Sequence, residues 1–127
     1  MKDRRVISTD EAPQPIGPYE QAVGVNGTYY ISGQVALEAS SGTMKNENVE
    51  AETHQVMKNV GAILEKAGLN YEHLVKCTIF LTDLNSFSKV NEVYGRFFNE
   101  MTPARECIEV SKLPKGATVE IAAIAAE

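Results

Sequence analysis

The sequence predicts an α+β domain in which two helices pack on one face of a single mixed β-sheet. Residues 49–67 and 87–98 place apolar side chains at helical spacing, while other apolar segments alternate as strands do. The predicted order is strand, hairpin, helix, strand, helix, hairpin. Because two helices cannot cover both faces of a sheet, the other face is expected to be buried, most simply against another copy of the chain.

Length and charge limit the possible partners. The chain has 127 residues, which predicts one domain over residues 1–127, and its formal net charge is −5. Its 12 basic residues are scattered, so neither nucleic acid nor a membrane is an expected partner. The charged N-terminal segment has no apolar stretch of a secretory signal, so a cytoplasmic location is expected.

The first predicted strand covers residues 4–8 and is followed by a proline-rich loop. Residues 12–18 contain three prolines, which exclude a helix or a central strand. A proline ligand for another domain is the alternative, although spaced prolines in a folded domain more often stiffen a loop. The loop is therefore expected to hold Tyr19 in a fixed place.

A β-hairpin is predicted from residues 22–25 and 29–32. The two runs flank Asn26-Gly27, a pair that tolerates the positive φ angles of a tight hairpin turn. Ser32-Gly33 interrupts the second arm. A glycine there indicates a bulge or a close approach by another group, or simply the end of the strand.

The first helix is predicted from Val49 to Ala67, after a polar loop over residues 38–48. Asn48 can cap its start, Glu52 suits the positive end of the helix dipole, and Gly68 suits a left-handed stop. An amphipathic helix at this place supplies one apolar face for the sheet.

A buried strand and a second helix follow. Residues 74–82 are apolar on both faces, with Val75 and Cys77 on one side and Leu74 on the other. Asp83 or Asn85 is expected to cap the helix over residues 87–98. Asn91 lies on the apolar stripe of this helix. Its amide is expected either to bond a loop backbone or to point into a site.

The last two strands are predicted over residues 105–110 and 118–125, joined by a turn at residues 113–116 into an antiparallel hairpin. Strand alternation puts Arg105 and Cys107 on one face. A guanidinium among apolar strand residues needs an anion, which is either an acid of the same chain or a bound carboxylate. Both remain open from the residues alone.

Glu120 is a glutamate in an otherwise apolar strand, so it is expected to have a partner such as Lys115 or to face solvent. Counting back from the turn puts Glu120 roughly opposite Glu109, about 13 Å along the strand from Arg105. A shared site would then need a bulge that shifts the register, a long site, or a neighbouring subunit.

Metal chemistry has no support in the pattern. The two histidines, His54 and His73, lack metal-ligand spacing or a thiolate companion. Cys77 and Cys107 are expected to be buried thiols. Cys107 also invites a nucleophilic role, but no histidine is placed to activate it, so packing is the prediction.

Several short motifs occur in order along nearly the whole chain. They are Ile16-Gly17-Pro18-Tyr19, Ser32-Gly33-Gln34, Asp83-Leu84-Asn85, Val90-Asn91, Pro103-Ala104-Arg105, Cys107, Glu109-Val110, Leu113-Pro114-Lys115 and Val119-Glu120-Ile121. In this combination the sequence resembles the RidA (YjgF) family of enamine/imine deaminases. The resemblance implies a chorismate-mutase-like α+β fold that assembles as a homotrimer with clefts between subunits.

The resemblance also implies a reaction, the hydrolytic deamination of 2-enamino and 2-imino acids, from 2-aminoacrylate and its homologues, to 2-keto acids and ammonia. No metal or cofactor is expected, because an iminium carbon is already electrophilic. Arg105 would clamp the substrate carboxylate and Glu120 would orient or deprotonate the attacking water. The implied substrate-binding residues are Tyr19, Ser32, Gly33, Asn91 and Cys107, with Gly33 and Cys107 acting through their backbone.

The chain departs from the family pattern at three positions. Glu106 replaces a small residue, Thr102 replaces a frequent aromatic, and Ala36 replaces a proline. Glu106 points away from Arg105, yet a nearby carboxylate is expected to weaken affinity for an anionic substrate. Two other functions stay open: a non-catalytic module that binds small carboxylates and, ranked lower because of the acidic charge, an endoribonuclease or translation inhibitor.

Overall fold

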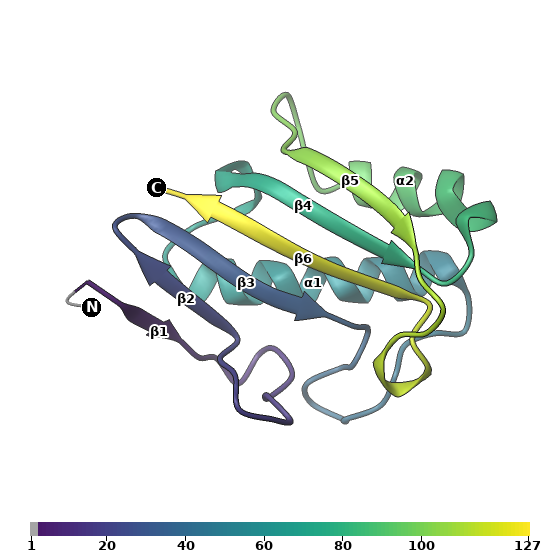
Figure 1. Cartoon of the computed structure of the whole chain (residues 1–127), viewed down its shortest axis with the longest axis horizontal. Helices are drawn as coiled ribbons and strands as arrows, with labels where there is room; N and C mark the ends of the chain where they lie inside the picture. Colours follow the sequence, from purple (N-terminus) through teal and green to yellow (C-terminus); the bar gives the residue numbers. More distant parts are fainter. Residues whose placement is uncertain (1–2) are drawn as a thin grey trace.

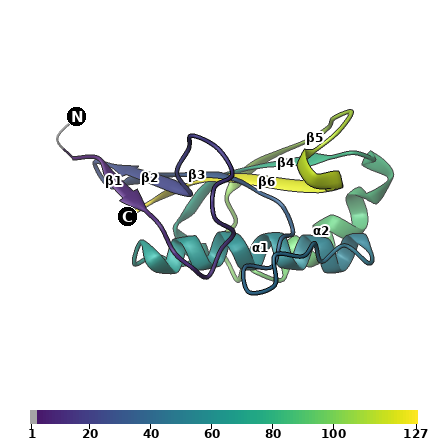
Figure 2. The ribbon, with the colours of Figure 1, turned by 90° about the horizontal axis from the view of Figure 1, so that it is seen from below.

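Six strands form one mixed sheet, and both helices lie on the same side of it in the computed structural model, which describes residues 3–127 (Figures 1 and 2). This confirms the predicted α+β class and the placement of the helices. The strands are β1 (Arg5–Ile7), β2 (Ala22–Val25), β3 (Thr28–Gln34), β4 (Leu74–Leu81), β5 (Ala104–Glu109) and β6 (Val119–Ala126). The helices are α1 (Val49–Lys66) and α2 (Phe87–Gly95), with 3₁₀ turns at Tyr71–His73, Leu84–Ser86 and Pro114–Gly116.

The order of the strands corrects the prediction for the C-terminal part. The sheet runs β1-β2-β3-β6-β4-β5, so the expected hairpin between residues 105–110 and 118–125 is wrong. Instead β5 pairs in parallel with β4, after a crossover through α2, and β6 pairs antiparallel with both β3 and β4. The reason lies in composition, because β6 is apolar enough for a central position whereas β5 carries charges that suit an edge.

Local signals predicted the β2–β3 turn and both ends of α1 correctly. Asn26 and Gly27 have φ angles of 51° and 81° in the β2–β3 hairpin. The side chain of Asn48 accepts a hydrogen bond from the Ala51 amide at 2.7 Å, which caps α1. Gly68 has a φ of 81° just past the end of α1. These signals are sequence-local, so they can be recognised without knowing the fold.

The second helix is shorter than predicted. Asp83 caps the 3₁₀ turn that precedes α2, accepting from the Asn85 amide at 2.9 Å. The α-helix ends at Gly95, so Phe97 and Phe98 of the predicted stripe lie beyond it. Phe98 is nevertheless buried in the core. The apolar pattern therefore marks burial at Val90, Tyr94 and Phe98 but not at Phe87, which is 38% exposed, and it overestimates the helical length.

The core lies between the helices and one face of the sheet. Along β6 the residues Val119, Ile121, Ala123 and Ala125 are buried, so every second side chain of this strand faces the helices. Cys77 of β4 is fully buried in the same layer, as predicted. The alternate side chains of β6, including Glu120, face the side of the sheet away from the helices.

The start of β4 differs from the predicted alternation. A register shift between Leu74 and Lys76 inserts an extra residue. Leu74 is consequently 5% exposed and belongs to the core, while Val75 is 48% exposed. The bulge exchanges the faces that the sequence pattern predicted for these two residues.

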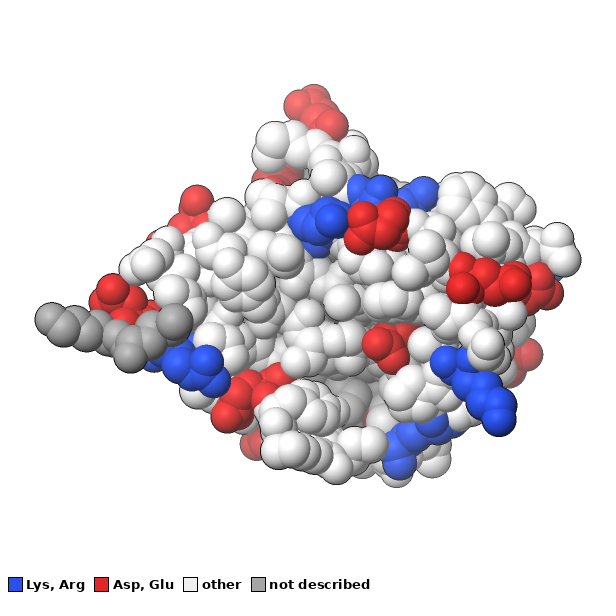
Figure 3. All heavy atoms as spheres, in the orientation of Figure 1, with Lys and Arg blue, Asp and Glu red and all other residues white. Residues whose placement is uncertain are grey.

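The face of the sheet opposite the helices is exposed to solvent in the single chain. Val6, Tyr30 and Ile108 are between 46% and 51% exposed on it. Figure 3 shows this face, which is largely uncharged over the middle of the sheet and has most of its charges toward the rim. Exposed apolar area of this kind is typical of an interface.

No helix within residues 3–127 is long and apolar enough to cross a membrane.

Candidate functional site

Four of the predicted site residues line one cavity of about 360 Å³ at the end of β3 and β6. They are Tyr19, Ser32, Gly33 and Glu120. Apolar surface comes from Pro13, Ile16, Leu37 and Pro114, and Lys115 adds a positive charge. The cavity therefore combines the carboxyl group of Glu120, the amino group of Lys115 and the backbone at Gly33 with an apolar wall.

Of the alternatives left open at Ser32-Gly33, the structure has a shift of register, and Gly33 also lies close to Glu120. The register of β3 against β6 shifts between Ile31 and Gln34. A Cβ atom at Gly33 would overlap the Glu120 carboxylate, so only glycine allows this approach. Burial raises the pKa of Glu120. The carboxyl group is therefore easier to protonate than an exposed glutamate.

Gln21 holds the proline-rich loop against this cavity, a role that the sequence did not indicate. It is 2% exposed and accepts from the Thr9 amide at 2.7 Å. Its amide nitrogen donates to the carbonyls of Thr9, Ala12 and Pro13 at 2.9 to 3.3 Å. The partners are all backbone groups, so no residue pattern could reveal them. The contacts fix the loop that leads to Tyr19.

Glu52 fixes the other wall. The sequence assigned it only a favourable place in the dipole of α1, but its side chain is buried. Its carboxylate accepts from the amides of Thr118 and Val119 at 2.7 and 3.1 Å, and from the Thr118 hydroxyl at 2.5 Å. These bonds hold the first residues of β6 and so position Glu120.

Arg105 and Asn91 form a second cluster, on the helix side of β5. Nη1 of Arg105 donates to Oδ1 of Asn91 at 2.6 Å. The guanidinium carbon lies 5.4 Å from the ring centroid of Phe87 and 5.2 Å from that of Tyr94. Of the two alternatives for Asn91, the amide does not bond a loop backbone here; it points toward Arg105.

Cys107 follows on the same face of β5, next to Ile79 of β4. Its thiol is partly buried, and this burial raises the pKa despite the nearby Arg105 charge. A raised pKa disfavours the thiolate, the form that acts as a nucleophile. The environment of Cys107 therefore fits packing better than covalent catalysis.

Glu106 points to the open face, as strand alternation predicted. It accepts from the Thr78 hydroxyl and lies 3.1 Å from Nζ of Lys76. The Thr78 hydrogen bond, followed by the Lys76 interactions, lowers the pKa of Glu106. Its charge is thus paired on the opposite side of the sheet from the Arg105 guanidinium.

The two clusters do not meet within one chain. Arg105 of β5 pairs with Cys77 of β4, which in turn pairs with Ala123 of β6. Glu120 also lies on β6, two strands from β5 and three residues before Ala123. Strand spacing then puts the Cα atoms of Arg105 and Glu120 roughly 14 Å apart. Because Arg105 faces the helices and Glu120 the open side, the chain contains two half-sites. We call them the Arg105 half-site and the Glu120 half-site.

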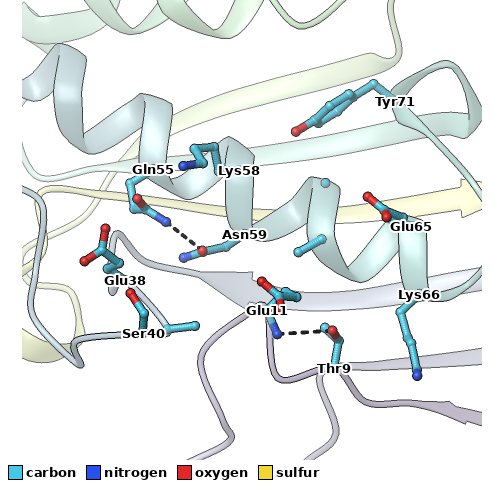
Figure 4. Close-up of a pocket in the computed structure, with 13 residues that line it drawn as sticks. Thr9, Glu11, Glu38, Ser40, Gln55, Lys58, Asn59, Glu65, Lys66 and Tyr71 are labelled. Atoms are coloured by element: carbon cyan, nitrogen blue, oxygen red, sulfur yellow. Dashed lines mark hydrogen bonds between the residues drawn. The ribbon is translucent and has the colours of Figure 1, made fainter.

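A larger hollow, with a volume of about 790 Å³, lies elsewhere, between α1 and the neighbouring loops (Figure 4). None of the predicted site residues lines it. Its central amides already have structural partners, since Gln55 donates to Asn59 and Asn59 donates to the carbonyls of Val35 and Leu37. These bonds tie a loop to α1, so we assign the hollow to loop packing.

Comparison with known proteins gives a consistent result. A family model described as Endoribonuclease L-PSP matches residues 9–127. The human protein named 2-iminobutanoate/2-iminopropanoate deaminase is 48% identical over 122 residues, which cover 96% of this chain and 89% of that protein. Among solved structures, the YjgF gene product of E. coli has a TM-score of 0.93 and 41% identity, covering 97% of this chain and 98% of that one. E. coli TdcF with bound serine has a TM-score of 0.93 and 39% identity, covering 97% and 99%.

Proposed function

The chain belongs to the Endoribonuclease L-PSP family, which is the RidA (YjgF) family, and we propose that it hydrolyses reactive 2-imino acids to 2-keto acids and ammonia. Curated mammalian relatives of nearly the same length carry the deaminase name at 48% to 49% identity. The substrates we propose are 2-aminoacrylate, after tautomerisation to its imine, and its homologues.

The observation that supports this proposal most strongly is the state of Arg105. Among residues 3–127 no carboxylate lies within 4.0 Å of its guanidinium, so its charge is oriented without being neutralised. A guanidinium with free donors binds a planar carboxylate through two parallel hydrogen bonds. The carboxylate common to all 2-imino acids supplies this partner.

The proposed chemistry needs one water and three proton transfers. Glu120 accepts a proton from water as the water oxygen bonds to the carbon of the protonated imine, giving a neutral carbinolamine. The same group returns this proton to nitrogen, and the C–N bond breaks so that ammonia leaves. The hydroxyl proton passes to the Glu120 carboxylate as the C=O bond forms, and from there to solvent. Burial raises the pKa of Glu120, which makes its carboxyl group easier to protonate and so suits a group that must both accept and donate a proton. Backbone groups at Gly33 and Cys107 would hold the substrate's polar atoms.

We propose that a complete site forms between subunits of a homotrimer. The Arg105 half-site and the Glu120 half-site lie on opposite faces of one chain, so they combine only if a second chain brings its own half-site alongside. The open, largely uncharged sheet face supplies a surface for such packing (Figure 3). The trimeric number comes from the family resemblance.

The test is release of ammonia and keto acid from 2-aminoacrylate generated in situ, compared with the spontaneous rate. We expect clear acceleration by the folded oligomer. Saturable binding of 2-oxobutanoate without any acceleration would instead support the second candidate, a non-catalytic module for small carboxylates. The serine bound to TdcF, a relative of the same fold, is the observation in favour of that candidate.

A third candidate follows from the family description itself, which names an endoribonuclease. The net charge of −5 and the scattered basic residues give RNA no continuous basic surface. Cleavage of RNA at moderate salt that is lost in an Arg105→Ala variant would promote this candidate over the deaminase.

A further inference from the structure

The arginines of this chain are held in different ways. Arg96 forms an ion pair with Glu92 at 2.7 Å on the surface of α2. Arg5 donates to the Tyr29 hydroxyl at 2.6 Å, and that hydroxyl in turn donates to the Glu127 carboxylate at 2.7 Å. Each of these two charges is therefore linked to a carboxylate of the same chain, directly or through one hydroxyl.

Arg105 is held by neutral groups alone within the described residues. Three side chains of α2 surround it, spaced four and three residues apart, so they form one stripe of the helix. Asn91 accepts one hydrogen bond from Nη1, and the rings of Phe87 and Tyr94 lie within 5.4 Å of the guanidinium carbon. We call these three residues the α2 cradle.

Neutral partners have a particular consequence for a cation. An amide oxygen and aromatic faces attract a guanidinium and restrict its rotation, but they leave its net charge in place. Arg105 has five N–H donors, and one hydrogen bond, to Asn91, is recorded for it among residues 3–127. The remaining donors are free for an incoming anion.

Tyr94 acts on Arg105 through its ring. The side chain is 5% exposed and packs against Phe98 at a ring distance of 4.9 Å. Burial, followed by the nearby Cys77 thiol, raises the pKa of Tyr94, and the hydroxyl makes no well-aligned hydrogen bond within the described part of the chain. The hydroxyl is therefore directed to Cys77, and the ring is the part of Tyr94 that contacts Arg105.

We infer that Phe87, Asn91 and Tyr94 are positioning residues that hold Arg105 in one orientation, fully charged, before the substrate binds. The inference rests on the proposed role of Arg105 as a carboxylate clamp. It changes the role assigned to Asn91 from contact with the substrate to support of the clamp. It also adds Phe87 and Tyr94, for which the sequence gave no role in the site.

The experiment uses the full-length protein with isotope-labelled arginine, studied by NMR without ligand and then titrated with 2-oxobutanoate. In the wild type the Arg105 Nε–H order parameter is expected to be near 0.85, roughly that of rigid backbone, and in Phe87→Leu to fall below about 0.6. The same variant is expected to bind 2-oxobutanoate about fivefold more weakly. Phe97→Leu is the matched control, because its ring packs against His54 and Tyr71, and it should change neither value.

Asn91→Asp separates orientation from charge. It keeps the shape of the side chain and places a carboxylate against Nη1, so Arg105 should stay ordered while 2-oxobutanoate binds at least about tenfold more weakly. Unchanged Arg105 order in Phe87→Leu, or unchanged affinity in Asn91→Asp, would overturn the inference. A wild type that binds 2-oxobutanoate but does not accelerate deamination would overturn the proposed reaction and leave the cradle in place.

Discussion

The two half-sites differ in how the protein surrounds their ionisable groups. The Arg105 half-site fills the space around a cation with neutral side chains, so the charge is kept and its direction is fixed. The Glu120 half-site leaves an open cavity beside a partly buried carboxyl group, and burial makes its charged form less favourable. The comparison shows two different environments, and these match the roles we propose for them, binding a charge at Arg105 and exchanging a proton at Glu120.

Removing the cation is expected to have the largest effect. Arg105→Ala should lower kcat/KM for 2-aminoacrylate deamination by at least about a thousandfold, because the substrate carboxylate loses its bidentate partner. Steady-state ammonia release at matched protein concentration measures this. Arg96→Ala is the control, since it removes an exposed arginine paired with Glu92 and should leave activity unchanged. Equal losses in both variants would contradict a specific clamp.

Removing the acid is expected to have the next largest effect. Glu120→Gln should lower kcat by about a hundredfold, because amide cannot transfer the proton. In the wild type, activity should fall as the pH drops through the raised pKa of Glu120, at a higher pH than for an exposed glutamate. A pH–rate profile whose acidic limb survives in Glu120→Gln would assign that limb to another group.

Replacing Glu120 should lower activity but raise thermal stability. A raised carboxyl pKa gives stability that is fully present below the unfolded pKa and is lost as the pH rises through the folded value. Glu120→Gln is therefore expected to raise Tm slightly at pH 7. Glu106→Gln is the matched control, because the lowered pKa of Glu106 predicts a slight decrease.

Filling the space at the bulge is expected to have a moderate effect. Gly33→Ala introduces a Cβ atom that overlaps the Glu120 carboxylate, so this side chain must move and activity should fall about tenfold. Gly95→Ala is the control, since a Cβ atom there meets no atom within 4 Å. Full activity in Gly33→Ala would show that the placement of Glu120 is not critical.

Removing the thiol should have the smallest effect. Cys107→Ala is expected to keep activity within about threefold of the wild type, because the raised pKa disfavours a thiolate and imine hydrolysis needs no covalent intermediate. Near-complete loss in a variant with unchanged Tm would make Cys107 a catalytic group and break the division between the two half-sites.

Local sequence signals predicted much of the fold. The turn at Asn26-Gly27, the cap at Asn48 and the stop at Gly68 depend on neighbouring residues only, and all three are confirmed. The pairing of β5 was predicted wrongly, because strand order depends on contacts between distant segments. The low charge of β6 and the charges of β5 did carry the signal for a central strand and an edge strand.

The sequence supplied candidate residues for the site, which remain predictions, but it could not supply their geometry. The sequence named Arg105, Asn91 and Glu120, but alternation and turn counting could not show that the first two share a face that Glu120 avoids. The supports Gln21 and Glu52 were missed because they bind mainly backbone groups. The partners of Gln21 lie 8 to 12 positions away and the backbone partners of Glu52 lie 66 and 67 positions away. Such contacts have no counterpart in short motifs.

The central claim is that two chains complete one site, and subunit mixing tests it most directly. Arg105→Ala and Glu120→Gln chains, each nearly inactive alone, would be unfolded, combined in equal amounts and refolded, with mixed oligomers verified by mass spectrometry. If one chain supplies Arg105 and its neighbour supplies Glu120, random assembly leaves about a quarter of the sites intact, so about a quarter of wild-type activity should return. Verified mixed oligomers with no more activity than the two variants alone would contradict the shared site.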